Sequence, residues 1–497
     1  MSKPRELWVD LSTSVRWDGG VIGIVRAELE LARAMHALNP KTRFCAFNGE
    51  AFVEMQHERI RWLFESRSVA DAYLKVRDYF RAAADYRQPK RGPQTIEYPR
   101  YQEMLSQLPP VAQNRMGQLR LSLLFGATAI PASELLLKGM LRLYEPLRGK
   151  KPGKGAKGGP GHEADTVRPE EWTLPAGTPP ARSPFTANST VVCAGWMDTG
   201  REKHLTAIKA ATPGLRIAQL VYDVIPIHED LAHLYPESGS VRFTNYFSWV
   251  SNTADVVFTG GANTAKDVET YQRKLKLPTP KAVPVRFGDA KLAEELQYDP
   301  VRDYYPDDGT LLRMLRIAKP YVLCVGTVEA RKNHAVLYEA MRVLFDRHGV
   351  NTPLMVFAGI PDARTRDLMD SVARDPKTRD HILHIVPTDH QLQVAYRNAA
   401  FTVLPSLYEG WSLTLPESLS FGKFALVSDV PPLKEIGEDR VEYLPPHEPV
   451  RWADRIEHYL AHPDELARRE AHIKATWKQN TWTGCAETML RALEAVS

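Results

Sequence analysis

The stretch FTVLPSLYEGWSLTLPESLSFG, residues 401–422, predicts a strand, a turn and a short helix in succession. FTVLPS is an apolar run of the strand type, and LYEGWS is a turn at its carboxyl end. Pro416 suits the first turn of the following helix, with Thr414 as its cap, and Gly422 is expected to end that helix. The turn would then present backbone N–H groups from about Gly410 to Leu413 at the positive end of a helix dipole, where a phosphate can bind.

Two carboxylates, Glu409 and Glu417, flank this predicted phosphate site. Carboxylates would repel a phosphate unless they face another group, and the hydroxyls of a sugar and of a ribose are suitable donors to them. A nucleotide sugar resolves the conflict. One glutamate would then contact each of its two sugar rings, and the diphosphate would bind to the backbone amides between them. In the alternative, Glu409 is a solvated turn residue and Glu417 only complements the helix N-terminus.

Apolar strands alternate with helices on both sides of this stretch, which predicts parallel sheets covered on both faces. We expect two Rossmann-like halves, and in such sheets ligands bind beyond the carboxyl ends of the strands. The strands predicted in the first half include residues 7–12, 189–196, 215–227, 255–260 and 281–288, and those in the second half are 321–326, 353–359, 382–386 and 401–406.

The first half opens with a strand, a glycine-containing loop and a helix over 24–38. Gly19, Gly20 and Gly23 do not match the spacing G-x-G-x-x-G, so the pattern does not support a dinucleotide fingerprint. Residues 54–146 are rich in helix formers, and the Gly/Pro/Lys-rich stretch that follows, to about 185, cannot bury a core.

The composition is that of a soluble globular protein, with 43% hydrophobic and 25% charged residues among 497. This length exceeds one ordinary core, so two domains are expected. A formal net charge of +4 does not indicate nucleic-acid binding. Four cysteines lie far apart and predict buried thiols rather than a disulfide frame or a zinc site: Cys45, Cys193, Cys324 and Cys485.

Blocks of the second half resemble the retaining glycosyltransferases of family 4. PSLYEGWSLTLPESLSFGKFALVSDVPPLKEIGED (405–439) is similar to their donor-site signature, P-S-x-x-E-G-[FW]-G-L leading into P-x-x-E and S-x-x-x-x-x-x-E. YVLCVGTVEARKNHAVLYEAM (321–341) resembles their V-G-x-x-x-x-[RK]-K-N segment. In the first half, LVYDVIPIHED (220–230) looks like the mannosyltransferase-like branch. The resemblance implies the GT-B fold, two Rossmann-like domains facing a central cleft.

The resemblance also implies donor-side roles. Arg331 and Lys332 would bind the leaving diphosphate, and Gly326 would let the backbone approach the phosphates. Glu409 would stabilise the developing positive charge of the donor sugar, and Glu417 would hold the ribose hydroxyls. The remaining donor-binding positions are Gly410, Trp411, Ser412 and Leu413, of which Ser412 stands where the family usually has glycine.

On the acceptor side, the same resemblance points to residues near the strand ends of the first half. Asp223 matches the family and joins Glu409, Arg331 and Lys332 as an expected catalytic residue, while Tyr222 stands where the family often has histidine. The other expected acceptor-side residues are Gly19, Gly20 and Gly23. Arg26 either follows them into the cleft or is a plain helix-surface residue. No metal site is expected, because cations and amides bind the diphosphate in this fold.

We therefore expect an acceptor domain over 1–305 with a helical and basic insertion at about 54–185, a donor domain over 306–475, and a helix over 476–497 that packs back toward the first domain. The predicted activity is retaining transfer of a hexosyl group to a hydroxyl of a cell-surface glycan or lipid-linked precursor, as in polysaccharide biosynthesis. The resemblance to the mannosyltransferase-like branch favours GDP-mannose as the donor, and UDP sugars are the next most favoured donors. The alternatives are an inactive sugar-nucleotide-binding partner subunit and a GT-B epimerase or phosphorylase.

A basic segment over 133–157 combines a run of lysines and arginines with interleaved leucines. This pattern suits an anionic membrane surface, and the alternative is a solvated loop beside an ordinary packed helix. The longest apolar run outside candidate strands, 121–130, is far short of the roughly 20 residues that span a bilayer. We expect a cytoplasmic protein, peripheral at most on the inner face of the membrane.

Overall fold

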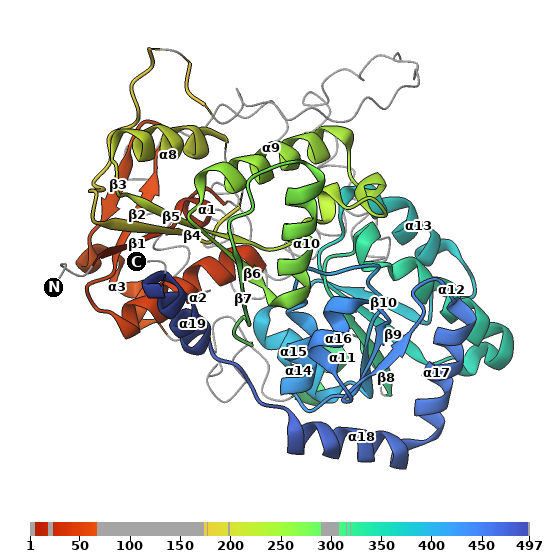
Figure 1. Cartoon of the computed structure of the whole chain (residues 1–497). Helices are drawn as coiled ribbons and strands as arrows, with labels where there is room; N and C mark the ends of the chain where they lie inside the picture. The colour runs from red at the N-terminus through yellow and green to blue at the C-terminus, as the bar shows by residue number, and fades with distance from the viewer. Residues whose placement is uncertain are drawn as a thin grey trace, which may run out of the picture. The chain divides into compact units, whose positions relative to one another are not determined.

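The computed structural model describes residues 5–17, 23–66, 173–175, 177–196, 199–289, 308–314, 316–318 and 320–495. Backbone contacts divide the chain into two compact units, one of Met1–Arg87 with Val167–Ser497 and one of Gln88–Thr166. Both sheets described below belong to the first unit (Figure 1). Gly19, Gly20 and the basic segment over 133–157 lie outside the described residues.

The first sheet has seven strands in the order β3-β2-β1-β4-β5-β6-β7. All neighbouring pairs are parallel except β2 and β3, which are antiparallel. The strands are β1 (Glu6–Asp10), β2 (Arg43–Phe47), β3 (Phe52–Met55), β4 (Ser189–Cys193), β5 (Arg216–Val221), β6 (Val256–Gly260) and β7 (Ala282–Val285). β3 lies at the start of the range 54–185 that the sequence assigned to an insertion.

Two hydrophobic cores cover the faces of this sheet, because side chains alternate along each strand. Leu7 and Val9 of β1 enter one core, which receives α2 and α19, while Trp8 enters the other with α8, α9 and α10. The helices of this half are α1 (Ser12–Arg16), α2 (Gly23–Leu38), α3 (His57–Glu65), α8 (Thr199–Ala211), α9 (Glu237–Thr253), α10 (Gly261–Lys274) and, at the end of the chain, α19 (Trp482–Ala495).

The second sheet has six parallel strands in the order β10-β9-β8-β11-β12-β13. Its strands are β8 (Tyr321–Val325), β9 (Leu354–Ala358), β10 (Ile382–Ile385), β11 (Phe401–Leu404), β12 (Ala425–Ser428) and β13 (Glu442–Leu444). The helices are α11 (Asp308–Met314), α12 (His334–His348), α13 (Arg366–Arg374), α14 (Asp389–Asn398), α15 (Thr414–Ser420), α16 (Pro431–Gly437), α17 (Pro449–Ala461) and α18 (Pro463–Thr476). The predicted class, two Rossmann-like sheets, is confirmed.

The chain does not end on its second sheet. After α18 it returns to the first sheet, where α19 packs against α2 and β7. Trp482, Cys485 and Met489 of α19 are buried in the core that also contains Val9 and Val25. Figure 1 shows α19 beside α2. The final helix is thus part of the first core.

Two local predictions around the opening stretch have different outcomes. Gly422 follows the end of α15 with a φ of 66°, the left-handed conformation that ends helices, so the predicted stop is confirmed. The predicted cap at Thr414 is wrong, because α15 begins at this residue and its N-cap is Leu413. The Thr414 hydroxyl instead shares a hydrogen bond with Ser412 Oγ at 3.0 Å.

The predicted buried thiols are confirmed, since all four cysteines are buried and unpaired. No helix among the described ranges has the length and apolar character needed to cross a bilayer. In the same ranges, no group of three or more His, Cys, Asp or Glu side chains is arranged to hold a metal ion.

Candidate active site

A buried ionic cluster lies at the carboxyl ends of β8 and β11. Glu409 is only 3% exposed, and its two oxygens accept from Arg331 Nη1 and Lys332 Nζ, both at 2.6 Å. Ser406 Oγ also donates to Glu409 Oε1, at 2.7 Å. Arg331 reaches a second carboxylate, because its Nη2 donates to Glu329 Oε1 at 2.7 Å. The structure thus brings the three predicted donor-side charges into direct contact.

The two cations keep Glu409 ionised. Burial raises the pKa of this carboxyl, but the charges of Arg331 and Lys332 and the hydrogen bonds from Lys332 and Ser406 outweigh burial and lower the pKa to about 2. Glu409 therefore remains a carboxylate throughout the physiological pH range. It can stabilise a positive charge, but it cannot act as a general acid near neutral pH.

Local backbone geometry fixes this cluster. Gly326 follows β8 with a φ of +142°, a conformation that other residues rarely adopt. Asn333, after Arg331 and Lys332, donates through Nδ2 to the carbonyls of Pro405 and Pro446 at 3.0 and 2.7 Å. The first bond ties the loop after β8 to the loop after β11, which carries Glu409, and the second ties it to the loop after β13.

The second glutamate of the opening stretch, Glu417, has its own partners. It lies on α15 and is 8% exposed, and Tyr396 Oη donates to its Oε2 at 3.0 Å. Arg26 Nη1 of α2 lies 3.3 Å from its Oε1. Arg26 is therefore not a plain helix-surface residue, because its side chain reaches Glu417 of the second sheet's half. Gly23, at the start of the same helix, lies close to Leu413, since a Cβ on it would be 3.5 Å from Leu413 Cδ1.

The turn after Glu409 lies directly against the end of β5. A Cβ on Gly410 would overlap the carbonyl oxygen of Tyr222 and would lie 2.6 Å from the Cβ of Asp223. Thr264 Oγ1 of α10 donates to the Gly410 carbonyl at 2.9 Å. Only glycine at position 410 allows the turn to come this close to the end of β5. The turn thereby brings the predicted acceptor-side residues Tyr222 and Asp223 next to the ionic cluster.

Glu435 of α16 makes a further contact with the first sheet's helices. Its carboxylate accepts from the backbone N–H of Ala262 and of Asn263, at 2.6 and 2.9 Å, at the N-terminus of α10. Glu435 Oε2 also accepts from Asn263 Nδ2 at 2.6 Å. A carboxylate at this end of a helix satisfies free donors and complements the dipole. Trp411 packs beside this contact against Gly260 and Gly261.

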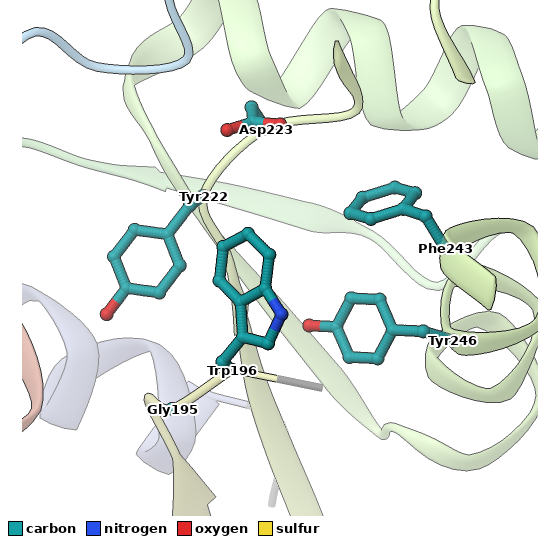
Figure 2. Close-up of a pocket in the computed structure, with 6 residues that line it drawn as sticks. All are labelled: Gly195, Trp196, Tyr222, Asp223, Phe243 and Tyr246. Carbon is teal, nitrogen blue, oxygen red and sulfur yellow. The ribbon is translucent and has the colours of Figure 1, made fainter. Parts of the chain in front are cut away.

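Asp223 and Tyr222 line a pocket at the carboxyl ends of β4 and β5 (Figure 2). Asp223 Oδ1 accepts from the backbone N–H of Ile225 at 3.0 Å. Burial raises the pKa of Asp223, and the positive charge of Arg331 opposes that shift. Tyr222 Oη donates to the carbonyl of Ala194 at 2.6 Å, which orients the ring. The pocket therefore adjoins the ionic cluster through Asp223.

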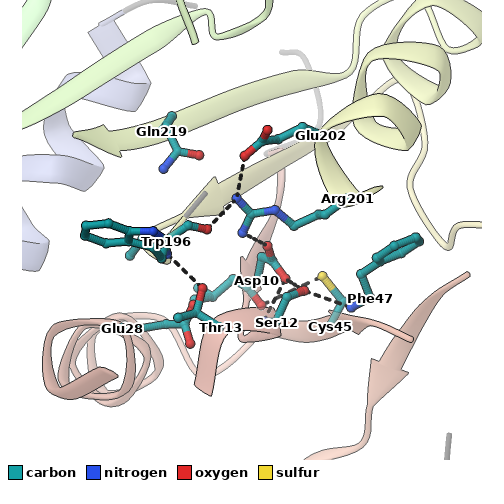
Figure 3. A network of polar contacts seen from close by, with 12 residues as sticks. Asp10, Ser12, Thr13, Glu28, Cys45, Phe47, Trp196, Arg201, Glu202 and Gln219 are labelled. Carbon is teal, nitrogen blue, oxygen red and sulfur yellow. Dashed lines mark hydrogen bonds and ion pairs between the residues drawn. The ribbon is translucent and has the colours of Figure 1, made fainter. Parts of the chain in front are cut away.

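A buried polar network adjoins this pocket at the backbone of Trp196 (Figure 3). Arg201 Nη1 is 2.9 Å from Asp10 Oδ2, and both side chains are fully buried. Glu28 Oε2 accepts from the backbone N–H of Ser14 at 2.6 Å and from the Ser14 hydroxyl. Its other oxygen has no hydrogen-bond partner among the described residues. The Glu28 carboxyl is thus buried with hydrogen bonds from the described residues to only one of its two oxygens.

Glu28 should make stability pH-dependent. Burial and the charge of Asp10 raise its pKa from 4.5 to about 8, although the bonds from Ser14 oppose the shift. The folded state then binds more protons than the unfolded state between these values, so stability falls as pH rises from about 4.5 to about 8. Replacing Glu28 with glutamine should raise Tm at pH 9 by ~2 °C or more, with little gain at pH 5.

Thermal unfolding of both proteins across this pH range measures the effect, and Glu50→Gln, at an exposed position of the same half, is the control. A Glu28→Gln variant whose stability relative to the wild type is the same at pH 5 and pH 9 would contradict a neutral Glu28 in the folded state.

The structure brings together most of the predicted site and adds residues that the sequence did not single out. Gly326, Glu409, Arg331 and Lys332 form one cluster, and Gly410 joins it to Asp223. The additional residues are Ser406, Tyr396, Glu435 and the pocket residues Trp196, Phe243 and Tyr246. An aromatic residue at the carboxyl end of a predicted strand could have identified Trp196. Nothing in the local pattern distinguishes Tyr396 from an ordinary core tyrosine.

Comparison with known proteins finds a matching family profile for the part of the chain that carries the second sheet. Residues 315–476 match the sequence profile described as glycosyl transferases group 1. The serotype-specific mannosyltransferase WbdA of Escherichia coli is 24% identical over 288 residues, which is 56% of this chain and 33% of the relative. The D-inositol 3-phosphate glycosyltransferase of Xylanimonas cellulosilytica is 28% identical over 196 residues, 37% of this chain and 46% of the relative.

Among solved structures, Anabaena HepE in complex with UDP superimposes with a TM-score of 0.48 and 12% identity, over 62% of this chain and 78% of that one. The chain spans about a third of the length of the curated relative WbdA, at 33%. Arg331, Lys332, Glu409 and Glu417 all lie within residues 315–476, the part of the chain that matches the glycosyl transferases group 1 profile.

Proposed function

We propose that the protein is a retaining glycosyltransferase that moves a hexosyl group, favoured as mannosyl, from a nucleotide diphosphate sugar to a hydroxyl of a glycan. The observation that carries the proposal is the buried cluster of Glu409 with Arg331 and Lys332, inside a domain of the glycosyl transferases group 1. The name of the relative WbdA supports mannose, and with it GDP-mannose as the donor. UDP sugars are the alternative donors.

In this proposal Arg331 and Lys332 hold the leaving diphosphate. Their side chains are 15% and 16% exposed, so they are largely desolvated yet reachable by a ligand. Arg331 supplies a planar fork and Lys332 a point charge with three donors. Preorganised charges of this kind stabilise the negative charge that builds on the leaving group in the transition state. No metal is required for this role.

Glu409 serves the other side of the breaking bond. Its ionised carboxylate stabilises the positive charge that develops on the donor sugar. Both of its oxygens already accept from cations, which makes it a weak nucleophile. This arrangement favours a same-face displacement, in which the departing phosphate takes the acceptor proton, over a covalent intermediate on Glu409.

Glu417 holds the ribose hydroxyls of the donor. Tyr396 orients its Oε2, and Arg26 approaches its Oε1. The backbone from Gly410 to Leu413 lies between the two glutamates and contacts the diphosphate. Asp223, beside Gly410, lies on the acceptor side together with Tyr222.

Two other functions are weighed against transfer. An inactive partner subunit would not need the buried ionic cluster, whose assembly requires three charged side chains in contact. A GT-B epimerase or phosphorylase is the second alternative, and the sequence shows no phosphorylase-type cofactor lysine motif. Docking on an anionic membrane through residues 133–157, near a lipid-linked acceptor, is a prediction from the sequence.

A screen of nucleotide sugars for thermal stabilisation tests the proposal. A bound donor stabilises the folded protein by mass action, by ~2.7 kcal/mol at a concentration one hundred times Kd. Tm rises as a result. GDP-mannose or a UDP sugar should stabilise the protein, while free hexoses and nucleoside monophosphates should do so much less. The shift should persist in the presence of EDTA. If no nucleoside diphosphate sugar stabilises the protein, the proposed function is wrong.

A further inference from the structure

The pocket at the carboxyl ends of β4 and β5 has an unusual lining for a polar protein surface. Four of its six residues are aromatic, and a carboxylate lies at its edge: Gly195, Trp196, Tyr222, Asp223, Phe243 and Tyr246. We call this set the aromatic pocket. Figure 2 shows the indole of Trp196 between Tyr222 and Tyr246, with the Tyr246 hydroxyl directed toward it. None of the functions assigned above to the donor site uses Trp196, Phe243 or Tyr246.

Trp196 presents its ring while its backbone is held firmly. The side chain is 41% exposed. Its backbone N–H donates to Thr13 Oγ1 at 2.8 Å, and its carbonyl accepts from Arg201 Nη2 at 3.2 Å. Because the backbone of Trp196 is already held by these two bonds, no backbone ordering is needed at this position when a ligand binds to the exposed ring.

The anchor of Trp196 is itself buried and rigid (Figure 3). Arg201 is fully buried against Asp10. Gly195, just before Trp196, fits closely between Thr13 and Glu28, since a Cβ there would overlap Thr13 Oγ1 and lie 2.5 Å from Glu28 Oε1. Position 195 therefore accepts only glycine, and the buried network fixes the backbone from which the Trp196 side chain extends.

The aromatic pocket opens beside the reacting centre. Asp223 lines the pocket and is also adjacent to Gly410, the residue that follows Glu409. The charge of Arg331 acts on the same carboxylate. A ligand in the pocket would therefore meet the donor site at Asp223, which can accept hydrogen bonds from ligand hydroxyls.

The chemistry of the lining selects among acceptors. Aromatic faces suit the apolar C–H face of a pyranose ring, and Asp223 suits its hydroxyls. None of the six lining residues is basic, and the Asp223 carboxylate would repel a phosphate. A phosphorylated polyol, the acceptor suggested by the name of one relative, does not match this lining.

Resting on the proposed function, we infer that the aromatic pocket binds an uncharged pyranose ring of the acceptor, stacked on Trp196, with a hydroxyl directed to Asp223. The acceptor end that reacts is then a neutral sugar of a glycan and not a phosphorylated polyol. Trp196 is a substrate-binding residue of the acceptor side, and the buried Arg201 positions it.

Saturation-transfer NMR with defined probes tests this inference. The probes are the methyl α-pyranosides of mannose, glucose and galactose, together with D-mannitol and myo-inositol 1-phosphate. At least one pyranoside should bind, most strongly through its ring C–H protons, while mannitol and the inositol phosphate should not compete with it. Trp196→Ala should weaken pyranoside binding about tenfold, as expected for loss of an aromatic stacking contact. Trp196→Phe, which keeps an aromatic face, should retain most of the affinity.

The matched control is Trp62→Ala, on α3, which removes a tryptophan that does not line the pocket and should leave pyranoside affinity unchanged. Equal affinity of the wild type and Trp196→Ala, absence of binding by all three pyranosides, or displacement by inositol phosphate would overturn the inference. These failures differ from failure of the proposed function, which appears in the wild type as an absence of stabilisation by any nucleotide sugar.

Discussion

Replacing Arg331 with alanine is expected to lower kcat/KM by about a hundredfold to a thousandfold, the loss that follows removal of one preorganised charge-stabilising donor. The guanidinium contacts Glu409, Glu329 and the carbonyl of Tyr408, so its position is fixed before a ligand binds. In the proposed function it also contacts the diphosphate. Initial rates with the donor found in the thermal screen, and calorimetric titration with the corresponding nucleoside diphosphate, measure both losses.

The control for this prediction is an arginine outside the site. Arg342 of α12 is 40% exposed and pairs with Glu339 and Asp375. Arg342→Ala should keep kcat/KM close to the wild-type value, because an exposed pair contributes little. Wild-type turnover together with wild-type nucleotide affinity in Arg331→Ala would show that Arg331 does not bind the diphosphate.

Replacing Glu409 with glutamine should nearly abolish turnover without weakening the binding of the bare nucleoside diphosphate. The change removes the charge that opposes Arg331 and Lys332, and loss of one partner of a buried pair destabilises by about 3–5 kcal/mol. A bound diphosphate supplies negative charge to the same two cations. The nucleotide should therefore raise the Tm of Glu409→Gln by at least as much as it raises that of the wild type.

Glu417→Ala provides the contrast to Glu409→Gln. Its proposed partner is the ribose, so this variant should lose affinity for the bare nucleoside diphosphate, which calorimetry can measure. The two variants should thus separate into one with poor turnover and intact nucleotide binding, and one with poor nucleotide binding. The reverse pattern would exchange the roles of the two glutamates.

The sequence predicted the sheets well because buried parallel strands leave a strong pattern. Runs such as YVLCV and FTVL are mostly apolar and almost entirely buried, and the helices between them show clear periodicity. Four strands were not among those predicted: β2, β3, β12 and β13. β3 is a short antiparallel edge of which half the residues are not buried, and β12 and β13 have only four and three residues. The cap of α15 was also mistaken, because threonine suits the first helical turn as well as the capping position.

The donor side of the candidate site was predicted more fully than the acceptor side, where only Tyr222 and Asp223 of the pocket residues were expected. Arg331, Lys332 and Glu409 follow strand ends, and the resemblance of the two surrounding blocks to one family grouped them. Trp196 depends on contacts with Thr13 and Arg201, residues 183 and 5 positions away in sequence, which no local pattern encodes. The sequence also did not indicate that Glu409 would bind both cations at once.

The return of the chain at α19 has a consequence for recombining this protein with its relatives. Because Trp482 and Met489 complete the core under the first sheet, the segment that carries the second sheet is an insert between two parts of one domain. A chimera with a different donor domain therefore needs two crossovers, one before α11 and one after α18. A single crossover between the sheets would pair the first sheet with a foreign final helix and leave its core mismatched.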